Sequence, residues 1–222
     1  MKNFPKAFLF DLNGTMVDDM EYHVKAWYGI LNKDLKANMS WEEVRSHMYG
    51  KNSELFVRVF GKNHFTDEEM EHWSMEKERR YQQNFFPHLQ LIDGLDGFLK
   101  QAQERKIRMA IGSAAIPFNI DFVLDNLHIR SYFNSIVSAD DVKVSKPDAE
   151  TYIKAASQLN EDPRNCIVFE DAPKGVEAAQ NAGMKTVVLT TMHNRNEFGN
   201  YSNVIAFVKD YTDPFLQTLF AD

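Results

Sequence analysis

The chain has 222 residues, of which 44% are hydrophobic, which fits one large domain or a core that carries a smaller insert. Its formal net charge of −7 argues against a nucleic-acid partner, because such proteins gather Lys and Arg on one face. The single cysteine, Cys166, excludes a disulfide framework and, within the apolar run CIVF, indicates a buried thiol. No apolar run approaches the roughly 20 residues of a membrane span, so we expect a cytoplasmic protein with no membrane partner.

The first predicted element is a buried strand at AFLF, residues 7–10, which ends at Asp11. Asn13 and Gly14 follow at once, and an Asn-Gly pair between apolar runs usually signals a hairpin turn. No partner strand follows Gly14, however. We therefore interpret FLFDLNGTMVDD as an active-site loop and not as a hairpin.

The next segment, 17–88, contains helix-like runs and no convincing strand. The runs are EYHVKAWYGILNK, SWEEVRSHM and TDEEMEHWSMEKERRYQQNF. We expect a helical cap at 17–88, inserted into an α/β catalytic core that consists of 1–16 and 89–222. The sequence shows neither heptads nor an obvious exposed apolar helix, so we expect a monomer.

Strands and helices alternate after the insert. Further strands are expected at IRMAIGS from Ile107, CIVF from Cys166, TVVL from Thr186 and VIAFV from Val204. Amphipathic helices are expected at DGLDGFLKQAQERK, PFNIDFVLDNL, DAETYIKAASQL and PKGVEAAQNAG. This alternation predicts an α/β fold with a doubly wound, parallel, Rossmann-like sheet, whose ligand crevice lies at the carboxyl ends of the strands.

Polar residues follow several of the apolar runs. Asp11 ends the first strand, Ser113 ends IRMAIGS, and Glu170 and Asp171 end CIVF. Lys146 follows a short apolar run and a charged loop. Each has an ordinary interpretation alone, as a turn carboxylate, a helix cap, a loop charge or a partner of a helix dipole. Because the carboxyl ends of parallel strands share one edge, we expect the five residues to meet there.

Together these residues are sufficient for phosphoryl transfer through an aspartyl phosphate. That reaction needs a carboxylate nucleophile, a hard cation and a lysine that offsets negative charge. Asp11, Glu170 and Asp171 offer the oxygen ligands that Mg²⁺ prefers. Ser113, which we place at a helix start, offers a hydroxyl and backbone N–H groups to the phosphate, and Lys146 supplies the positive charge.

The runs FDLNGT, IGSAA, VSKPDAETY and FEDAPKGVEAAQNAGM resemble, in this order, the four motifs of the haloacid dehalogenase superfamily. The resemblance spans nearly the whole chain, and the acidic pair before a helix of small residues is its most specific part. It implies a Mg²⁺-dependent phosphatase or phosphomutase. It also implies that Asp11 is the nucleophile and that Glu170 and Asp171 hold Mg²⁺, directly or through water.

The same resemblance implies a phosphate pocket. It assigns phosphate binding to Ser113 and the Ala114 amide, and it makes Lys146 a bridge between phosphate and Asp11. The backbone carbonyl of Asn13 is implied as a further ligand of the metal.

Within the superfamily, EYHVKAW resembles the β-phosphoglucomutase-like phosphatases and mutases. It places His23 and Trp27 one helical turn apart, and it implies a cap that closes over a sugar phosphate and excludes water. The match also puts Lys77 at the position of a cap lysine that contacts substrate. The alternatives are a surface or hinge histidine at 23 and a solvated helix charge at 77.

Asn13 departs from the family pattern. The phosphatases and mutases usually have Asp here, as general acid to the leaving oxygen and then general base for the incoming nucleophile. An amide cannot titrate, and losing general acid–base help costs about 10² to 10⁴ in rate. The amide is either engineered, natural in an enzyme whose leaving group needs no proton, or the mark of a protein that binds phosphometabolites without turnover.

Two further departures concern a mutase assignment. Lys51, in GKNSE, stands where β-phosphoglucomutase has an arginine for the non-transferring phosphate, and the next basic residue is Arg58. A lysine lacks the bidentate fork, and AAIP after Ser113 is less polar than in the mutase. Both favour a plain phosphatase. Lys51 also leaves open a carbon–phosphorus hydrolase with a Schiff-base lysine, against its ordinary interpretation as a solvated loop charge.

The sequence therefore predicts a Mg²⁺-dependent phosphohydrolase that acts on a small phosphorylated metabolite, such as a sugar phosphate, and that is slowed by Asn13. A phosphomutase, a carbon–phosphorus hydrolase and a non-catalytic phosphometabolite binder stay as alternatives.

Overall fold

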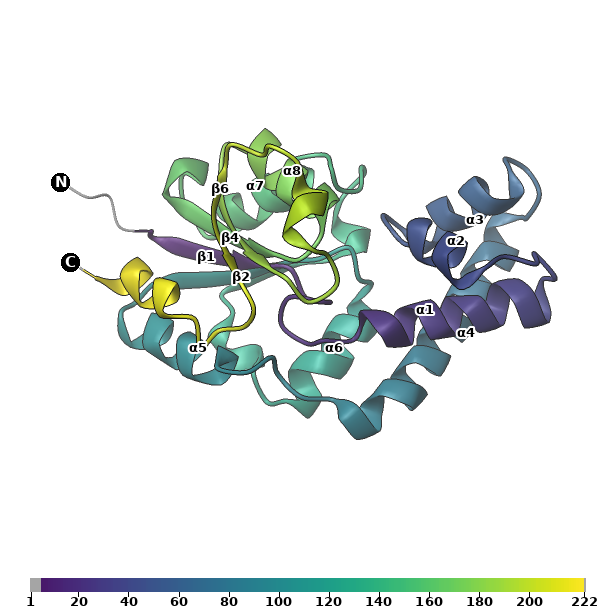
Figure 1. Ribbon diagram of the computed structural model, residues 1–222, viewed down its shortest axis with the longest axis horizontal. Coiled ribbons are helices and arrows are strands. Elements are labelled where there is room, and N and C mark those ends of the chain that lie inside the picture. The colour runs from purple at the N-terminus through teal and green to yellow at the C-terminus, as the bar shows by residue number, and fades with distance from the viewer. Residues whose placement is uncertain (1–4, 222) are drawn as a thin grey trace. The chain divides into compact units, whose positions relative to one another are not determined.

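The computed structural model describes residues 5–221 (Figure 1). The chain divides into two compact units. One unit, here called the core unit, takes in the chain up to Asp18 and from Gln90 onward, and the other, the helical unit, is Asp19–Leu89. That they act as a catalytic core and a cap stays a prediction.

The core unit is built on a six-stranded parallel sheet. Its strand order is β3-β2-β1-β4-β5-β6. The strands are β1 Ala7–Phe10, β2 Arg108–Gly112, β3 Ser135–Val137, β4 Cys166–Glu170, β5 Lys185–Leu189 and β6 Val204–Val208. In chain order, β2 and β3 lie on one side of β1, and β4, β5 and β6 lie on the other side. The strand order therefore reverses between β1 and β4. This topology confirms the predicted doubly wound, Rossmann-like α/β fold.

Helices cover both faces of the sheet (Figure 1). They are α5 Leu95–Glu104, α6 Pro117–Asn126, α7 Glu150–Gln158 and α8 Pro173–Asn181. Helices α7 and α8 lie on one face and α5 on the other (Figure 1). The sequence indicated all four helices and five of the six strands. It did not single out β3, because this edge strand has only three residues, SIV, of which two are half-buried.

Alternation of side chains along β1 explains how the sheet is covered on both faces. Ala7 and Leu9 belong to the apolar cluster under α7 and α8. Phe8 points the other way and packs on Phe98 of α5, with ring centroids 5.2 Å apart. Cys166, at the start of β4, is buried as expected. Complete burial of a side chain such as Phe8 or Leu9 stabilises the fold by about 1.5–3 kcal/mol. The position of β1, and with it the start of the loop that follows, is therefore fixed.

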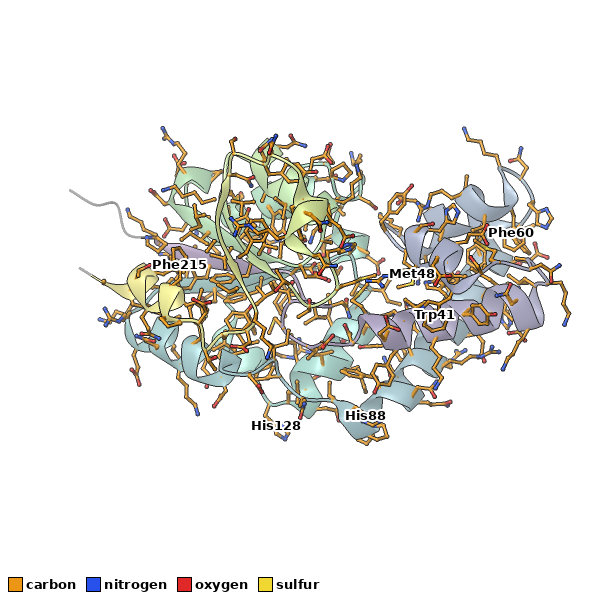
Figure 2. All side chains as sticks on the ribbon, in the orientation of Figure 1. Trp41, Met48, Phe60, His88, His128 and Phe215 are labelled. Atoms are coloured by element: carbon orange, nitrogen blue, oxygen red, sulfur yellow. The ribbon has the colours of Figure 1, made fainter. Side chains whose placement is uncertain are left out.

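The helical unit contains α1 Met20–Tyr28, a π-helical segment Gly29–Asp34, α2 Trp41–Ser46, α3 Asn52–Phe60 and α4 Asp67–Phe85. Ser40 and Thr66 begin α2 and α4 with capping boxes. Trp41, Met48 and Phe60 surround the apolar centre of this unit (Figure 2). Helix α3 was not among the predicted elements, because its short apolar run does not distinguish helix from strand. Among the described helices, none combines the length and the apolar character that crossing a bilayer requires.

Candidate active site

Asp11 and Glu170 lie side by side because their strands do. Phe10 of β1 is in register with Phe169 of β4, and the Asp11 amide donates to the Phe169 carbonyl at 3.0 Å. Glu170 is the last residue of β4 and Asp171 follows it. The carboxylates therefore meet at the carboxyl edge of the sheet, beside the point where strand order reverses, which is where ligands bind in such folds.

Lys146 connects these carboxylates. Its buried Nζ lies 2.7 Å from Asp11 Oδ1 and 2.7 Å from Glu170 Oε1. It also donates to the Tyr152 hydroxyl at 2.8 Å, and this hydroxyl donates in turn to Glu170 Oε1 at 2.8 Å. Burial alone would lower the pKa of Lys146, but the charges of Asp11 and Glu170 outweigh burial and raise it. The ammonium group therefore stays charged at neutral pH.

The site has the donor set of a cation site. Ligand oxygens of Asp11, Glu170 and Asp171 all lie within 4.8 Å of one another. Asp171 Oδ1 accepts a hydrogen bond from Thr15 Oγ1 at 3.2 Å, whereas Asp171 Oδ2 is buried with no hydrogen-bond partner among the described residues. Burial, followed by the charges of Glu170 and Asp11, raises the pKa of Asp171 well above its ordinary value. A hard divalent cation would satisfy this orphaned oxygen and balance the excess of carboxylates over lysine, so the residues fit such an ion.

The loop after β1 is held in place from several sides. The Gly14 amide donates to the Val17 carbonyl at 2.8 Å, and the Thr191 hydroxyl donates to the Gly14 carbonyl at 2.6 Å. The Tyr211 hydroxyl donates to the Thr15 carbonyl at 3.1 Å. Asn13 is half-buried and forms an isolated bridge with Val17. β1 pairs only with parallel strands in the described sheet, so the Asn-Gly pair does not form a hairpin between β1 and a following strand.

Gly14 is required by the close approach of Asp171. Its φ is +73°, and a Cβ at this position would lie 2.1 Å from Asp171 Oδ2. We expect Gly14→Ala to abolish catalytic activity, together with the rise in unfolding temperature that we expect when a divalent cation such as Mg²⁺ is added. Gly183→Ala is the matched control, because Gly183 has the same φ of +73° but nothing within 4 Å of its Cβ position. Both variants lose about 1–2 kcal/mol from the left-handed backbone. Equal effects of the two variants on the Mg²⁺ response would contradict this account of the site.

Ser113 and Ala114 lie in the loop after β2, the strand next to β1. Ser113 is buried, and its Oγ accepts a hydrogen bond from the Ala115 amide at 3.1 Å. Helix α6 begins at Pro117, so the expectation that Ser113 sits at a helix start was wrong. The Ser113 side chain instead closes a local turn, which competes with helix formation.

Two other predicted residues meet within the helical unit. Lys77 Nζ lies 2.7 Å from His23 Nδ1 and 2.9 Å from Glu78 Oε2, and all three residues are buried. Asn52 donates to Glu78 Oε1 at 2.7 Å. Lys77 is therefore not a solvated helix charge, and His23 is not a surface residue.

The carboxylate of Glu78 makes the stability of the helical unit depend on pH. Burial would raise its pKa, but Lys77, His23 and Asn52 outweigh burial and hold the pKa at about 2, against the ordinary glutamate value of 4.5. The unfolded chain therefore binds the proton first as pH falls, so the stabilisation is complete above about pH 4.5 and is lost as pH falls toward 2. Its size is on the order of 3 kcal/mol.

Urea unfolding of Glu78→Gln at pH 7 and at pH 3.5 tests this dependence. All three tryptophans, Trp27, Trp41 and Trp73, lie in the helical unit, so tryptophan fluorescence reports on this unit. We expect the free-energy difference from the unsubstituted chain to be largest at pH 7 and to shrink at pH 3.5. The exposed Glu71 of α4 gives the control Glu71→Gln, for which we expect no such change. A difference for Glu78→Gln that is the same at both pH values would rule out the carboxylate as its source.

Lys51 is half-buried and directly precedes α3, where its amide donates to Glu54 Oε2 at 3.0 Å. Arg58 donates to the carbonyls of His47 and Tyr49, and its guanidinium lies 3.8 Å from the centre of the Tyr49 ring. Arg58 thus anchors the segment before α3.

Sequence reasoning missed several residues that complete these clusters. Tyr152 stands in the quoted motif VSKPDAETY, but no spacing rule connects it with Lys146 six residues earlier. In the helical unit, Tyr81 donates to Asp19 at 2.6 Å and stacks on His23, with centroids 3.7 Å apart. Tyr81 lies one helical turn after Lys77, and this spacing was the available signal.

Residues 8–189 match the family model described as haloacid dehalogenase-like hydrolase. The chain belongs to this family. The resemblance stated from its motifs is thereby confirmed, and the chain is an enzyme of the hydrolase and phosphotransferase class. An acidic cluster at the strand ends, which could hold a metal ion, agrees with this membership.

Named haloacid dehalogenase-like proteins are similar over most of the chain. β-Phosphoglucomutase of Bacillus subtilis is 30% identical over 188 residues, which cover 82% of each chain. Fructose-1-phosphate phosphatase of Escherichia coli is 27% identical over 186 residues, which cover 82% of this chain and 94% of that one. The crystal structure of a β-phosphoglucomutase from Clostridium difficile, 26% identical, superposes with a TM-score of 0.80 and covers 97% of this chain and 96% of its own.

Proposed function

We propose that the protein is a Mg²⁺-dependent phosphohydrolase that acts on a small phosphorylated metabolite, such as a sugar phosphate, through an aspartyl phosphate on Asp11. The observation that carries the proposal is the position of Lys146, whose Nζ lies 2.7 Å from both Asp11 Oδ1 and Glu170 Oε1 beside the unpartnered Asp171 Oδ2. A lysine that bridges a nucleophile and a cation site suits the charge of a phosphoryl group in transfer.

Each side chain then has a distinct task. Lys146 fixes Asp11 Oδ1, and the Asp11 carboxylate supplies the oxygen that attacks phosphorus. Ser113 Oγ and the Ala114 amide bind the phosphoryl oxygens. Glu170 and Asp171, with Asp11 and the Asn13 carbonyl, would hold Mg²⁺, which supplies positive charge to the phosphoryl oxygens.

Asn13 limits this chemistry. Its amide can donate a hydrogen bond but cannot transfer a proton to the leaving oxygen or take one from water. We propose that transfer to Asp11 and hydrolysis of the phosphoenzyme are both slow in this chain, most of all for alkoxide leaving groups, which need a proton. For acyl phosphates, whose leaving group needs none, the transfer step would be affected least, whereas hydrolysis of the phosphoenzyme would stay slow.

We propose further that the helical unit recognises the part of the substrate that is not transferred. This proposal is supported by the buried contact between Lys77 and His23, because burying a lysine and a histidine in so small a unit costs folding free energy. The names of the similar proteins, one a sugar phosphomutase and one a sugar-phosphate phosphatase, support phosphorylated sugars as the class.

The test is a panel of sugar phosphates, pyrophosphate and acyl phosphates, assayed for phosphate release with and without Mg²⁺. We expect Mg²⁺-dependent release that Asp11→Asn abolishes. No difference between the unsubstituted chain and Asp11→Asn on any compound would overturn the proposal.

One observation, Asn13 itself, favours a second candidate, a phosphometabolite binder without turnover. In that case ligand with Mg²⁺ raises the unfolding temperature, but neither the unsubstituted chain nor Asn13→Asp releases phosphate. The panel also separates the remaining alternatives: a mutase converts one sugar phosphate into its isomer. A carbon–phosphorus hydrolase would instead give an aldehyde adduct of Lys51 that borohydride traps.

A further inference from the structure

A groove of about 480 Å³ opens at the amino ends of β1 and β2. Lys6, directly before β1, and Arg108, the first residue of β2, help to line it. Asp11 directly follows β1, so this groove and the acidic cluster lie at opposite edges of the same sheet. Its volume falls within the roughly 300–1,000 Å³ of small-molecule sites, and we call it the basic groove.

Charge distinguishes the basic groove from the rest of the chain. Four cations line it against the single acid Glu161, although the chain as a whole carries −7; they are Lys6, Arg105, Lys106 and Arg108. Arg108 is partly neutralised, because its Nη1 lies 3.6 Å from Glu161 Oε1. The ammonium groups of Lys6 and Lys106 have no side-chain partner in residues 5–221. Such a concentration of unbalanced positive charge in an acidic protein favours an anionic ligand.

The backbone that carries these cations is fixed. The Lys106 amide donates to the Gln103 carbonyl at 2.9 Å, and the Arg108 amide donates to the Lys6 carbonyl at 3.1 Å. The Lys6 amide in turn donates to the Asn165 carbonyl at 2.8 Å. Ligand binding therefore does not need to order the backbone that carries these side chains, and this lowers the entropic cost of binding.

The basic groove also has an apolar part. Ile107 and Phe220 line it together with Leu219 and Pro5. Arg105 donates to the Phe220 carbonyl at 2.6 Å, and its guanidinium lies 5.6 Å from the centre of the Phe220 ring. Only one of its five N–H donors is used in that bond, so the others can meet a phosphate. A ligand that fits has several negative charges and a planar or apolar portion.

We propose that the basic groove binds a small organic polyphosphate of the nucleoside di- or triphosphate class, separately from the substrate phosphate at the opposite edge. Lys6 and Lys106 neutralise the phosphates, Arg105 binds them in bidentate fashion, and the base lies against the apolar wall. This second site does not depend on the reaction proposed for Asp11.

Calorimetric titration with ATP tests the second site. We expect saturable binding to the unsubstituted chain, and an affinity that is about tenfold lower or more in Lys6→Glu/Lys106→Glu, because two attractions become repulsions. Lys185→Glu is the matched control, because Lys185 is an exposed lysine at the start of β5 and is not among the groove residues. It should bind ATP as the unsubstituted chain does. If Lys6→Glu/Lys106→Glu fails to fold, the double variant Lys6→Gln/Lys106→Gln, which removes both charges without reversing them, takes its place.

Three kinds of result would overturn the proposal. One is a failure of the groove to bind ATP: either ATP shows no saturable binding, or the double variant binds it as tightly as Lys185→Glu does, which would place ATP outside the groove. Another is pyrophosphate binding as tightly as ATP, which would remove the nucleoside. The third is cosedimentation with phosphatidylglycerol vesicles that Lys6→Glu/Lys106→Glu abolishes while ATP does not bind, which would make the groove a membrane contact.

Discussion

Asn13→Asp raises kcat on the best alkyl phosphate ester of the panel by about 10² to 10⁴, because a carboxyl group at this position can protonate the leaving oxygen and then activate water. Asn13 follows Asp11, the proposed nucleophile, by two positions, and its loop is held by Thr191 and Tyr211, so the new side chain is expected to point as the amide does. Steady-state phosphate release at fixed Mg²⁺ measures the gain.

Asn13→Ala is the control for this gain. It removes the amide without adding a proton donor, so its kcat should stay at or below that of the unsubstituted chain. An acyl phosphate provides a second comparison, because its transfer to Asp11 needs no proton: the gain in kcat/KM should be much smaller than for the alkyl ester, whereas kcat, which hydrolysis of the phosphoenzyme limits, should rise. A gain below threefold for Asn13→Asp, or an equal gain for Asn13→Ala, would show that position 13 does not limit the reaction.

Lys146→Met removes the cation from between Asp11 and Glu170 while it keeps an apolar side chain of similar length. Breaking a buried ion pair from one side costs about 3–5 kcal/mol of unfolding free energy, since the remaining carboxylates lose their counter-charge. The rate should fall by about 10² to 10³ or more, as when a preorganised donor to the transition state is removed. Excess Mg²⁺ should restore part of the stability but not the rate.

The matched control for this change is Lys154→Met. Lys154 is only partly buried, and its Nζ donates to the Asp141 carbonyl at 2.6 Å and lies 3.4 Å from Asp141 Oδ1, so its loss should cost about 1 kcal/mol or less and leave the rate unchanged. Urea unfolding with and without Mg²⁺, together with phosphate release, compares the two variants. If both variants lose stability equally, Lys146 does not balance the charge of the acidic cluster.

The fold could be predicted from sequence where an element is long or strongly patterned. AFLF, CIVF and TVVL are buried on both faces and lack a helical period, so their strands were evident. Strand β3 was not evident, because three residues at a sheet edge are too few to show a recognisable hydrophobic pattern. α3 was missed for a related reason, since a short apolar run does not distinguish helix from strand.

The candidate site could be predicted where topology alone brings residues together. Asp11 and Glu170 end adjacent parallel strands, so their meeting follows from strand order. The hydrogen bond from Lys146 to Tyr152, and the one from Asn52 to Glu78, depend on how a loop and a helix pack, which no local spacing encodes. Burial of Lys77 was equally unpredictable, because a lysine on a helix is usually solvated and only its partners Glu78 and His23 make burial tolerable.

The measurement that tests the central claim most directly is mass spectrometry of the acid-quenched protein after reaction with an acyl phosphate in Mg²⁺. Under the proposal that Asn13 slows hydrolysis of the phosphoenzyme more than its formation from such a donor, we expect one added phosphoryl group on the peptide that contains Asp11, and none in Asp11→Asn. A phosphoryl group on another residue, or phosphate release from the donor with no phosphopeptide in either protein, would contradict it.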